Sequence, residues 1–203
     1  MAHKAQGLLL SSDFCEAVEY AVQMHLRQFR KGTSIPYVSH VLSVASLVLE
    51  YGGTEDEAIA ALLHDTVEDQ GGRQILDRIR RRFGDGVAVI VEGCTDADTI
   101  PKPPWRERKE AYIRHVEGAS APVCLVSAAD KLHNARAILR DYRDLGEELW
   151  SRFNGGRDGT LWYYRSLLEA FRTKVPDALF NELEGVVVAI ETLARDAGFA
   201  APA

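Results

Sequence analysis

The sequence lacks any apolar run long enough to cross a membrane, and it contains few cysteines. A membrane-spanning helix needs about 20 consecutive apolar residues, whereas the apolar run at residues 186–190 is short and is followed by charge. The start of the chain has only a short apolar stretch at residues 8–10, which does not resemble a secretory signal. The three cysteines, Cys15, Cys94 and Cys124, are widely spaced and odd in number. They favour reduced thiols over a disulfide framework, so we expect a cytoplasmic protein that does not associate with membranes.

The sequence also lacks an excess of basic charge, internal repeats and low-complexity segments. It has 24 Lys and Arg residues against 30 Asp and Glu residues, which gives a net charge of −6. A phosphate backbone attracts proteins with clustered positive charge, so we expect no nucleic-acid partner. A chain of 203 residues can bury a core without disulfides. No linker divides it, and we expect one domain over residues 1–203, with a core at about 13–175 and a C-terminal helix at about 176–198.

No segment shows the alternation of polar and apolar residues that is typical of a strand, and the chain is expected to be all-α. Apolar residues recur with the helical period, and glycines and capping residues interrupt them. The expected helices lie at about 13–30, 38–50, 54–70, 73–82, 85–94, 105–117, 122–145, 160–174 and 176–197. The expected loops lie at 95–104 and 154–159, where proline or glycine is frequent.

The most informative segment is residues 64–69, with the sequence His-Asp-Thr-Val-Glu-Asp. His64 and Glu68 are four residues apart, and so are Asp65 and Asp69, which would place each pair on one face of a continuous helix. The apolar residues 58–63 precede the segment. Ligands at the end of a buried helix are what a metal-dependent hydrolase requires.

His40 on the preceding predicted helix and Asp130 on a later one could complete a metal site with His64 and Asp65. Imidazole and carboxylate ligands suit Mn²⁺, Fe²⁺ or Zn²⁺, and two of each leave positions for water and a phosphate oxygen. The alternative is a buried, ion-paired cluster that only ties helices together. The spacing and the apolar flanks favour metal binding.

Several short motifs occur in an order that resembles the HD-domain hydrolases of RelA/SpoT type. The motifs are Arg-Lys-Gly at 30–32, Pro-Tyr-Val-Ser-His at 36–40, residues 61–69, Phe-Gly at 83–84, Cys-Thr-Asp at 94–96, residues 105–109 and Ala-Asp-Lys-Leu-His-Asn at 129–134. The resemblance covers about residues 20–170. It implies an HD-domain helical bundle that removes the 3′-pyrophosphate from guanosine tetra- and pentaphosphate, the alarmones of the stringent response. The length implies a stand-alone small hydrolase, without the synthetase and regulatory domains of the long enzymes.

The resemblance also assigns roles to matching residues. The residues that match metal ligands, usually of Mn²⁺, are His40, His64, Asp65 and Asp130. The acidic pair that activates or guides the attacking water matches Glu68 and Asp69. The residues that match nucleotide contacts are Arg30, Lys31, Asn134 and, in the base pocket, Tyr164. The chain departs from the family in having Val41 where proline commonly follows the first ligand, and in the glycine-rich exit at residues 70–72.

These observations predict a pyrophosphohydrolase that converts guanosine alarmones to GDP or GTP and pyrophosphate, with a small nucleotide as its partner. Two alternatives stay open: a related phosphohydrolase of adenosine alarmones or NADPH, and a non-catalytic nucleotide-binding module. The second is disfavoured because no acid of the motif is missing. Without the resemblance, Arg30 and Lys31 would be interpreted as a solvated last helical turn. His133 would be interpreted as a core histidine or one that supports a ligand.

Overall fold

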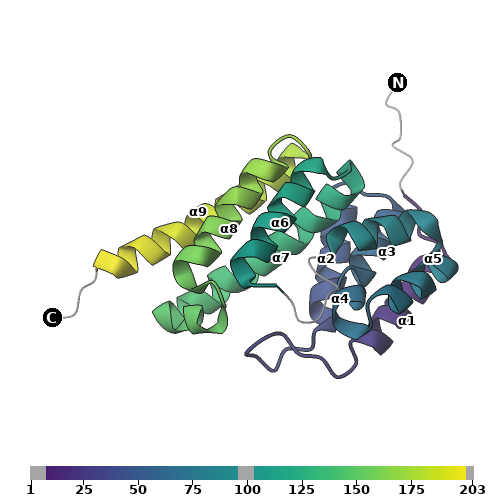
Figure 1. Cartoon of the computed structure of the whole chain (residues 1–203), viewed down its shortest axis with the longest axis horizontal. Helices are drawn as coiled ribbons and strands as arrows, with labels where there is room; N and C mark the ends of the chain where they lie inside the picture. The colour runs from purple at the N-terminus through teal and green to yellow at the C-terminus, as the bar shows by residue number, and fades with distance from the viewer. Residues whose placement is uncertain (1–7, 96–102, 200–203) are drawn as a thin grey trace.

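The computed structural model describes residues 8–95 and 103–199, and within these ranges the chain forms helices and no β-sheet (Figure 1). The prediction of an all-α fold is confirmed. The helices are α1 (Ser12–Met24), α2 (Val38–Glu50), α3 (Glu55–Leu63), α4 (Thr66–Gln70), α5 (Arg73–Cys94), α6 (Trp105–Gly118), α7 (Ala121–Leu145), the 3₁₀ helix η1 (Gly146–Arg152), α8 (Gly156–Phe171) and α9 (Asp177–Phe199). None of these helices is both long and apolar enough to cross a membrane.

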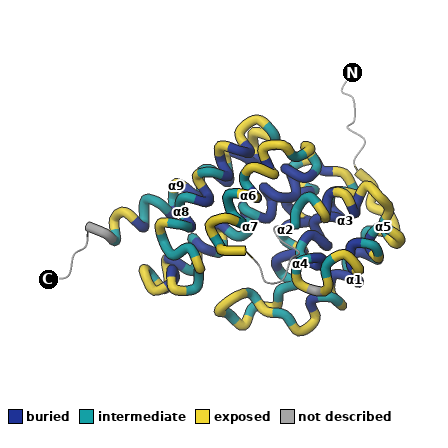
Figure 2. Tube along the Cα trace, in the orientation of Figure 1, coloured by how far each residue is buried: buried dark blue, intermediate teal, exposed yellow. Residues whose placement is uncertain are grey.

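Helix α3 lies at the centre of the group formed by α1 to α5. Its residues 58–63 are at most 2% exposed, and α1, α2, α5 and α7 all pack against it (Figure 2). A helix that is apolar all round is stable only when it is covered on all sides. The predicted capping box opens it: Thr54 Oγ1 accepts the backbone N–H of Glu57, and Glu57 Oε2 accepts that of Thr54. The polar residues at the C-terminal end of this buried helix therefore have a fixed position.

Helix α7 connects two groups of helices. It packs against α2, α3 and α5 on one side, and against α9 and η1 on the other. Helix α8 packs against α6, α9 and η1. Figure 1 shows α1 to α5 grouped on one side of α7, and α6, α8 and α9 on the other. Side chains on α7 can therefore face both groups.

The first helix is shorter than predicted, because the chain turns back on itself after Met24. The backbone N–H of Tyr37 donates to the carbonyl of Gln28, and that of Arg30 donates to the carbonyl of Ile35, both at 2.8 Å. This pairing of backbone groups replaces the helical bonds that residues 25–30 would have made. Leu26, which the helical period predicted to be inward, is 73% exposed. The prediction of a helix to about residue 30 was wrong, and residues 25–37 form an irregular loop.

The predicted continuous helix over residues 54–70 is interrupted between Leu63 and Thr66. Thr66 Oγ1 donates to the carbonyl of Leu63 at 2.6 Å, and His64 Nδ1 donates to that of Ala61 at 2.8 Å. Side chains thus satisfy carbonyl groups at the end of α3. The predicted stacking of residues four apart on one uninterrupted helix was therefore wrong, although the backbone N–H of Asp69 still donates to the carbonyl of Asp65 at 3.0 Å.

Other element boundaries follow the sequence closely or shift by a few residues. Helix α2 has the predicted bounds, and Gly84, with φ 90°, separates the two predicted halves of α5. Helix α8 begins at Gly156, so the predicted loop at 154–159 is shorter. The indole of Trp105 packs against this turn, where a Cβ added to Gly155 would lie 2.5 Å from the ring. Most of the predicted loop at 95–104 lies outside the described residues.

Candidate metal centre and active-site cavity

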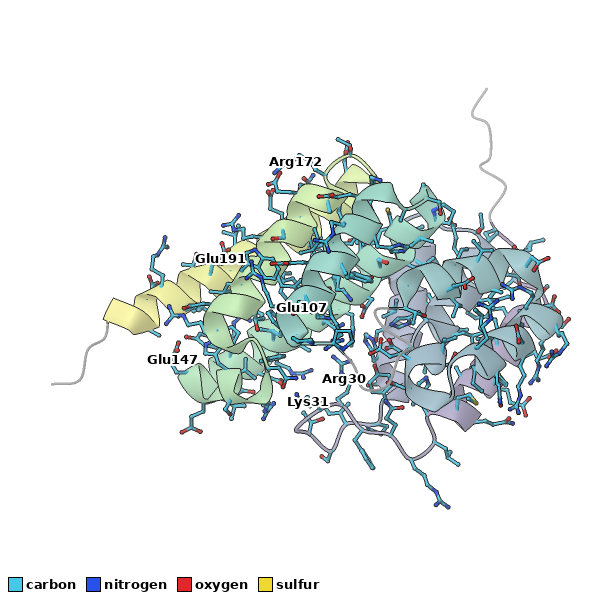
Figure 3. The ribbon with its side chains drawn as sticks, in the orientation of Figure 1. Arg30, Lys31, Glu107, Glu147, Arg172 and Glu191 are labelled. Atoms are coloured by element: carbon cyan, nitrogen blue, oxygen red, sulfur yellow. The ribbon has the colours of Figure 1, made fainter. Side chains whose placement is uncertain are left out.

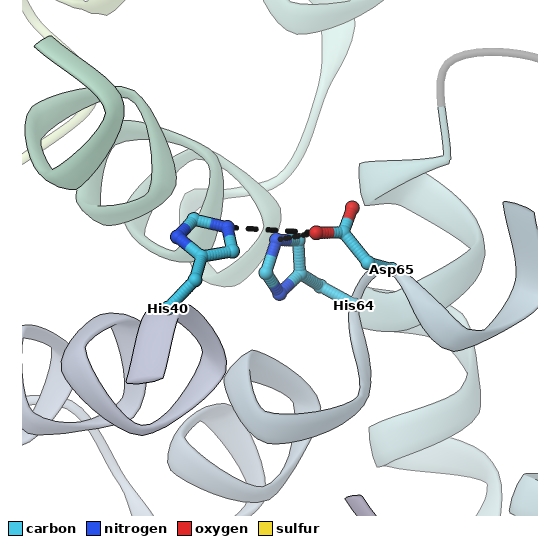
Figure 4. Close-up of side chains that lie close together, drawn as sticks. All are labelled: His40, His64 and Asp65. Atoms are coloured by element: carbon cyan, nitrogen blue, oxygen red, sulfur yellow. Dashed lines mark ion pairs between the residues drawn. The ribbon is translucent and has the colours of Figure 1, made fainter. Parts of the chain in front are cut away.

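Three of the four predicted metal ligands meet where α2, the end of α3 and the start of α4 converge. The ligand atoms of His40, His64 and Asp65 lie within 4.8 Å of one another (Figure 4). Asp65 Oδ2 is 3.0 Å from His64 Nε2 and 3.5 Å from His40 Nε2. Both imidazoles thus present Nε2 to the same carboxylate.

The fourth predicted ligand, Asp130, comes from α7. Its Oδ1 lies 3.2 Å from His40 Nε2 and 3.7 Å from His64 Nε2. The side chain is buried among the apolar residues of this helix. The structure therefore brings together all four residues, which are separated by up to 90 positions in the sequence.

The donor set fits a divalent cation. His64 Nδ1 donates to a backbone carbonyl, so Nε2 is the ring nitrogen that faces the carboxylates, and this buried atom makes no hydrogen bond among the described residues. Burial lowers the pKa of His64, but the carboxylates of Asp65 and Asp130 outweigh burial and hold that pKa well above its usual value. A cation bound by the same atoms would take the place of that proton, because ligand imidazoles are neutral.

A third histidine supports His40. Its Nδ1 lies 2.8 Å from His133 Nδ1. Burial, together with the charges of His40 and Arg30, lowers the pKa of His133 to about 4, so His133 is neutral near pH 7. The contact with His133 through Nδ1 leaves His40 Nε2 directed at the carboxylates of Asp65 and Asp130. The interpretation of His133 as a supporting histidine agrees with this geometry.

Two further residues orient the carboxylates, and neither was predicted from the sequence to have a role. Lys131 Nζ donates to Asp130 Oδ2 at 2.5 Å, and Tyr37 Oη donates to Asp65 Oδ2 at 2.5 Å. Burial and the neighbouring Asp65 raise the pKa of Tyr37, so it remains a protonated donor. Their only signal in the sequence was position, since Lys131 follows Asp130 and Tyr37 lies in the motif that ends at His40.

A cavity of about 450 Å³ opens beside the cluster. Its lining includes Asp65 and Asp130 and all four predicted nucleotide contacts, which are Arg30, Lys31, Asn134 and Tyr164. Arg30 donates from a terminal nitrogen to Asn134 Oδ1 at 2.6 Å, so the loop at 25–37 is joined to α7 across the cavity. Figure 3 shows Arg30 and Lys31 on this loop, near the group formed by α6, α8 and α9.

Positive charge predominates in the cavity. Seven of its lining residues are Lys or Arg and four are Asp or Glu. The basic residues are Arg30, Lys31, Arg108, Lys109, Lys131, Arg140 and Arg152. Tyrosine and tryptophan side chains, including Tyr37, Trp105 and Tyr163, supply flat apolar surface beside them. A cavity of this kind suits an aromatic compound that carries several negative charges.

The two residues of the predicted acidic pair have different environments. Glu68 lines the cavity together with Asp65. Asp69 is exposed and does not line it, and its Oδ2 accepts a hydrogen bond from Gln28 Nε2 at 2.7 Å. Gln28 Oε1 in turn lies 2.7 Å from His25 Nδ1. Glu68 is thus better placed to reach a reacting group, whereas Asp69 holds the loop at 25–37 near α4.

The sequence matches the HD domain family over residues 17–161. The chain belongs to the HD-domain family. It is 40% identical over 148 residues to a Xenopus tropicalis protein named guanosine-3′,5′-bis(diphosphate) 3′-pyrophosphohydrolase MESH1, covering 70% of this chain and 78% of the relative. The human protein of the same name is 37% identical over 144 residues, covering 70% and 75% of the two chains.

A solved structure agrees with the HD-domain assignment. The structure, of a metazoan orthologue of SpoT described as hydrolysing ppGpp, superposes with a TM-score of 0.71 and 27% sequence identity. The match covers 95% of this chain and 99% of the other. The predicted resemblance to RelA/SpoT-type HD-domain hydrolases, and among them to the metazoan SpoT homologue, is confirmed.

Proposed function

We propose that this HD-domain protein is a metal-dependent guanosine-3′,5′-bis(diphosphate) 3′-pyrophosphohydrolase, with Mn²⁺ as the metal. Its products would be pyrophosphate and GDP, or GTP when the substrate is the pentaphosphate. The observation that supports it most is the His40, His64, Asp65 and Asp130 cluster, which adjoins a cavity rich in basic residues. The relatives with this named activity, at 37–40% identity, support the same substrate class.

The four clustered residues would hold the cation, and Glu68 would act on the water. A bound divalent cation supplies positive charge to the reacting phosphate and lowers the pKa of water. Glu68 would accept a proton from the attacking water, whose oxygen forms a bond to the phosphorus attached to the ribose 3′ oxygen. The bond between that phosphorus and the 3′ oxygen breaks, the 3′ oxygen receives a proton, and pyrophosphate leaves.

Arg30 and Asn134 would position the nucleotide for this attack. The Arg30 guanidinium lies 5.7 Å from the centre of the Tyr37 ring and reaches Asn134 on the opposite wall. A planar guanidinium can stack on a base and also donate paired hydrogen bonds to phosphate. Lys31 adds a charge at the cavity rim, and Tyr164 offers a buried ring on the α8 side.

We expect Arg30→Ala and Lys31→Ala mainly to raise KM for the guanosine alarmone and to leave metal content intact. The reason is that both side chains belong to the loop at 25–37 and neither belongs to the metal cluster. Arg30→Lys should restore little, because lysine keeps the charge but loses the planar surface and the paired donors. Steady-state kinetics with elemental analysis of each variant would measure this. A large fall in kcat at unchanged KM would contradict a binding role.

The substrate assignment is tested by comparing kcat/KM across a panel with Mn²⁺. The panel contains guanosine and adenosine 3′-pyrophosphorylated nucleotides, NADPH, GTP and ATP. We expect the guanosine 3′,5′-bis(diphosphate) to be cleaved far faster than GTP and ATP. Equal values for GTP would leave a generic nucleotide phosphohydrolase, and a preference for adenosine alarmones or NADPH would replace the guanosine assignment.

We propose that residues 1–203 act as one catalytic unit. The predicted C-terminal helix, α9, packs against α7 and α8, and both of these helices carry residues that line the cavity. A cytoplasmic location remains a prediction that rests on Cys15, Cys94 and Cys124, each of which is a free thiol.

A further inference from the structure

One wall of the cavity is a single face of α7. Asp130, Asn134, Ile138 and Asp141 all line it, at the spacing of one helical face. With a rise of about 1.5 Å per residue, this face extends about 16 Å from Asp130 to Asp141. The metal cluster lies at one end of the face, and the other end lies well beyond reach of the cluster.

At the far end of this face, two arginines donate hydrogen bonds to the same carboxylate. Asp141 Oδ1 accepts hydrogen bonds from Arg140 at 2.8 and 3.0 Å, and its Oδ2 accepts one from Arg152 Nη1 at 3.1 Å. Each guanidinium has five N–H donors, and one carboxylate uses only some of them. Two positive charges face one negative charge, so this end of the cavity has a net positive charge and oriented donors that remain available.

Arg152 also lies against the loop at 25–37. A Cβ added to Gly32 would lie 3.0 Å from Arg152 Nε, and Gly32 has a φ of 71°, which favours glycine. The side chain of Arg152 is 26% exposed. Its contacts with Asp141 and with the loop restrict its position before any ligand binds. The loop that carries Arg30 therefore meets η1 at the far end of the cavity.

We propose that Arg140 and Arg152 form a second anion subsite, which binds the 5′-phosphate chain of a nucleotide whose 3′-diphosphate lies at the metal cluster. This inference rests on the proposed function, whose substrate has phosphates on both sides of the ribose, and it adds the residues that bind the 5′-phosphates. Such a compound has negative charge at both ends, and the cavity has basic groups at both ends. Arginine forks bind phosphate oxygens with paired, charge-assisted hydrogen bonds.

The test uses Arg140→Gln and Arg152→Gln, with Arg143→Gln as the matched control. Arg143 is an exposed arginine on the same helix end and does not line the cavity. The substrates are guanosine 3′-diphosphates that carry either a 5′-diphosphate or a 5′-hydroxyl. We expect the ratio of their kcat/KM values to favour the 5′-diphosphate in the wild type and to fall roughly 10-fold in each cavity variant. The control should keep the wild-type ratio.

Binding of GDP, compared with guanosine, by calorimetry gives a second measurement that needs no turnover. GDP should bind more tightly than guanosine, and this difference should shrink in Arg140→Gln and Arg152→Gln but not in Arg143→Gln. If the wild type hydrolyses 3′-diphosphates but neither the ratio nor the GDP preference changes in the variants, the second subsite is wrong. If no 3′-diphosphate is hydrolysed while the GDP preference still depends on both arginines, the proposed function fails and the subsite stands.

Discussion

Replacing His64 or Asp130 with alanine should abolish metal binding and turnover together. Each change removes one of four donor groups that lie within 3.0–3.7 Å of a neighbouring donor in the cluster. Metal content after dialysis, measured by elemental analysis, and hydrolysis of the guanosine alarmone would test this. Thermal unfolding adds an independent measurement: Mn²⁺ should raise the melting temperature of the wild type, because it binds the native state, and should not raise that of either variant.

Matched controls separate loss of a ligand from general damage. His115→Ala and Asp144→Ala remove the same side-chain types at exposed positions outside the cluster and the cavity. Both controls should keep their metal, their turnover and the stabilisation by Mn²⁺. Full metal occupancy in His64→Ala and Asp130→Ala would rule out these two residues as ligands, whatever their activity.

Glu68→Gln should keep the metal and the bound nucleotide but lose turnover by roughly 10²-fold or more, the usual scale for general acid–base groups. Glutamine has nearly the same shape as glutamate and keeps its hydrogen-bonding capacity, but it cannot accept the proton of the attacking water. The measurement is kcat, accompanied by nucleotide affinity and metal content. Normal hydrolysis by this variant would show that Glu68 does not handle the water.

Asp69→Asn is the matched comparison for Glu68→Gln. Because Asp69 is exposed, does not line the cavity and accepts a hydrogen bond from Gln28, its replacement should cost less turnover than that of Glu68. Asparagine can still accept that hydrogen bond through its carbonyl oxygen. A larger loss in Asp69→Asn than in Glu68→Gln would reverse the two roles.

Local sequence signals correctly predicted helix bounds where nearby residues determine the end of the helix. Helix α2 has its predicted bounds because Pro36 and the glycines at 52–53 limit it, and α3 begins at its predicted capping box. Helix α1 ends early because backbone groups of Gln28 and Tyr37 pair across a loop. The apolar period continues through Leu26, so nothing in the local pattern indicates that pairing.

The metal cluster was more predictable than the cavity around it. His64 and Asp65 are adjacent in sequence, His40 and Asp130 lie on other predicted helices, and the resemblance to a known family matches all four to metal ligands. In contrast, Arg152 reaches the cavity only because η1 follows α7 and packs against it. No periodicity or short motif distinguishes such an arginine from a solvated one, and its role depends on tertiary packing alone.

The most direct test of the central claim is identification of the products from guanosine 3′,5′-bis(diphosphate) with the purified, Mn²⁺-loaded protein. The proposed attack at the phosphorus next to the ribose 3′ oxygen predicts GDP and pyrophosphate in equal amounts, without orthophosphate. In ¹⁸O-labelled water, the label should appear in pyrophosphate and not in GDP. Stepwise release of orthophosphate, or cleavage of the 5′-diphosphate, would contradict a 3′-pyrophosphohydrolase.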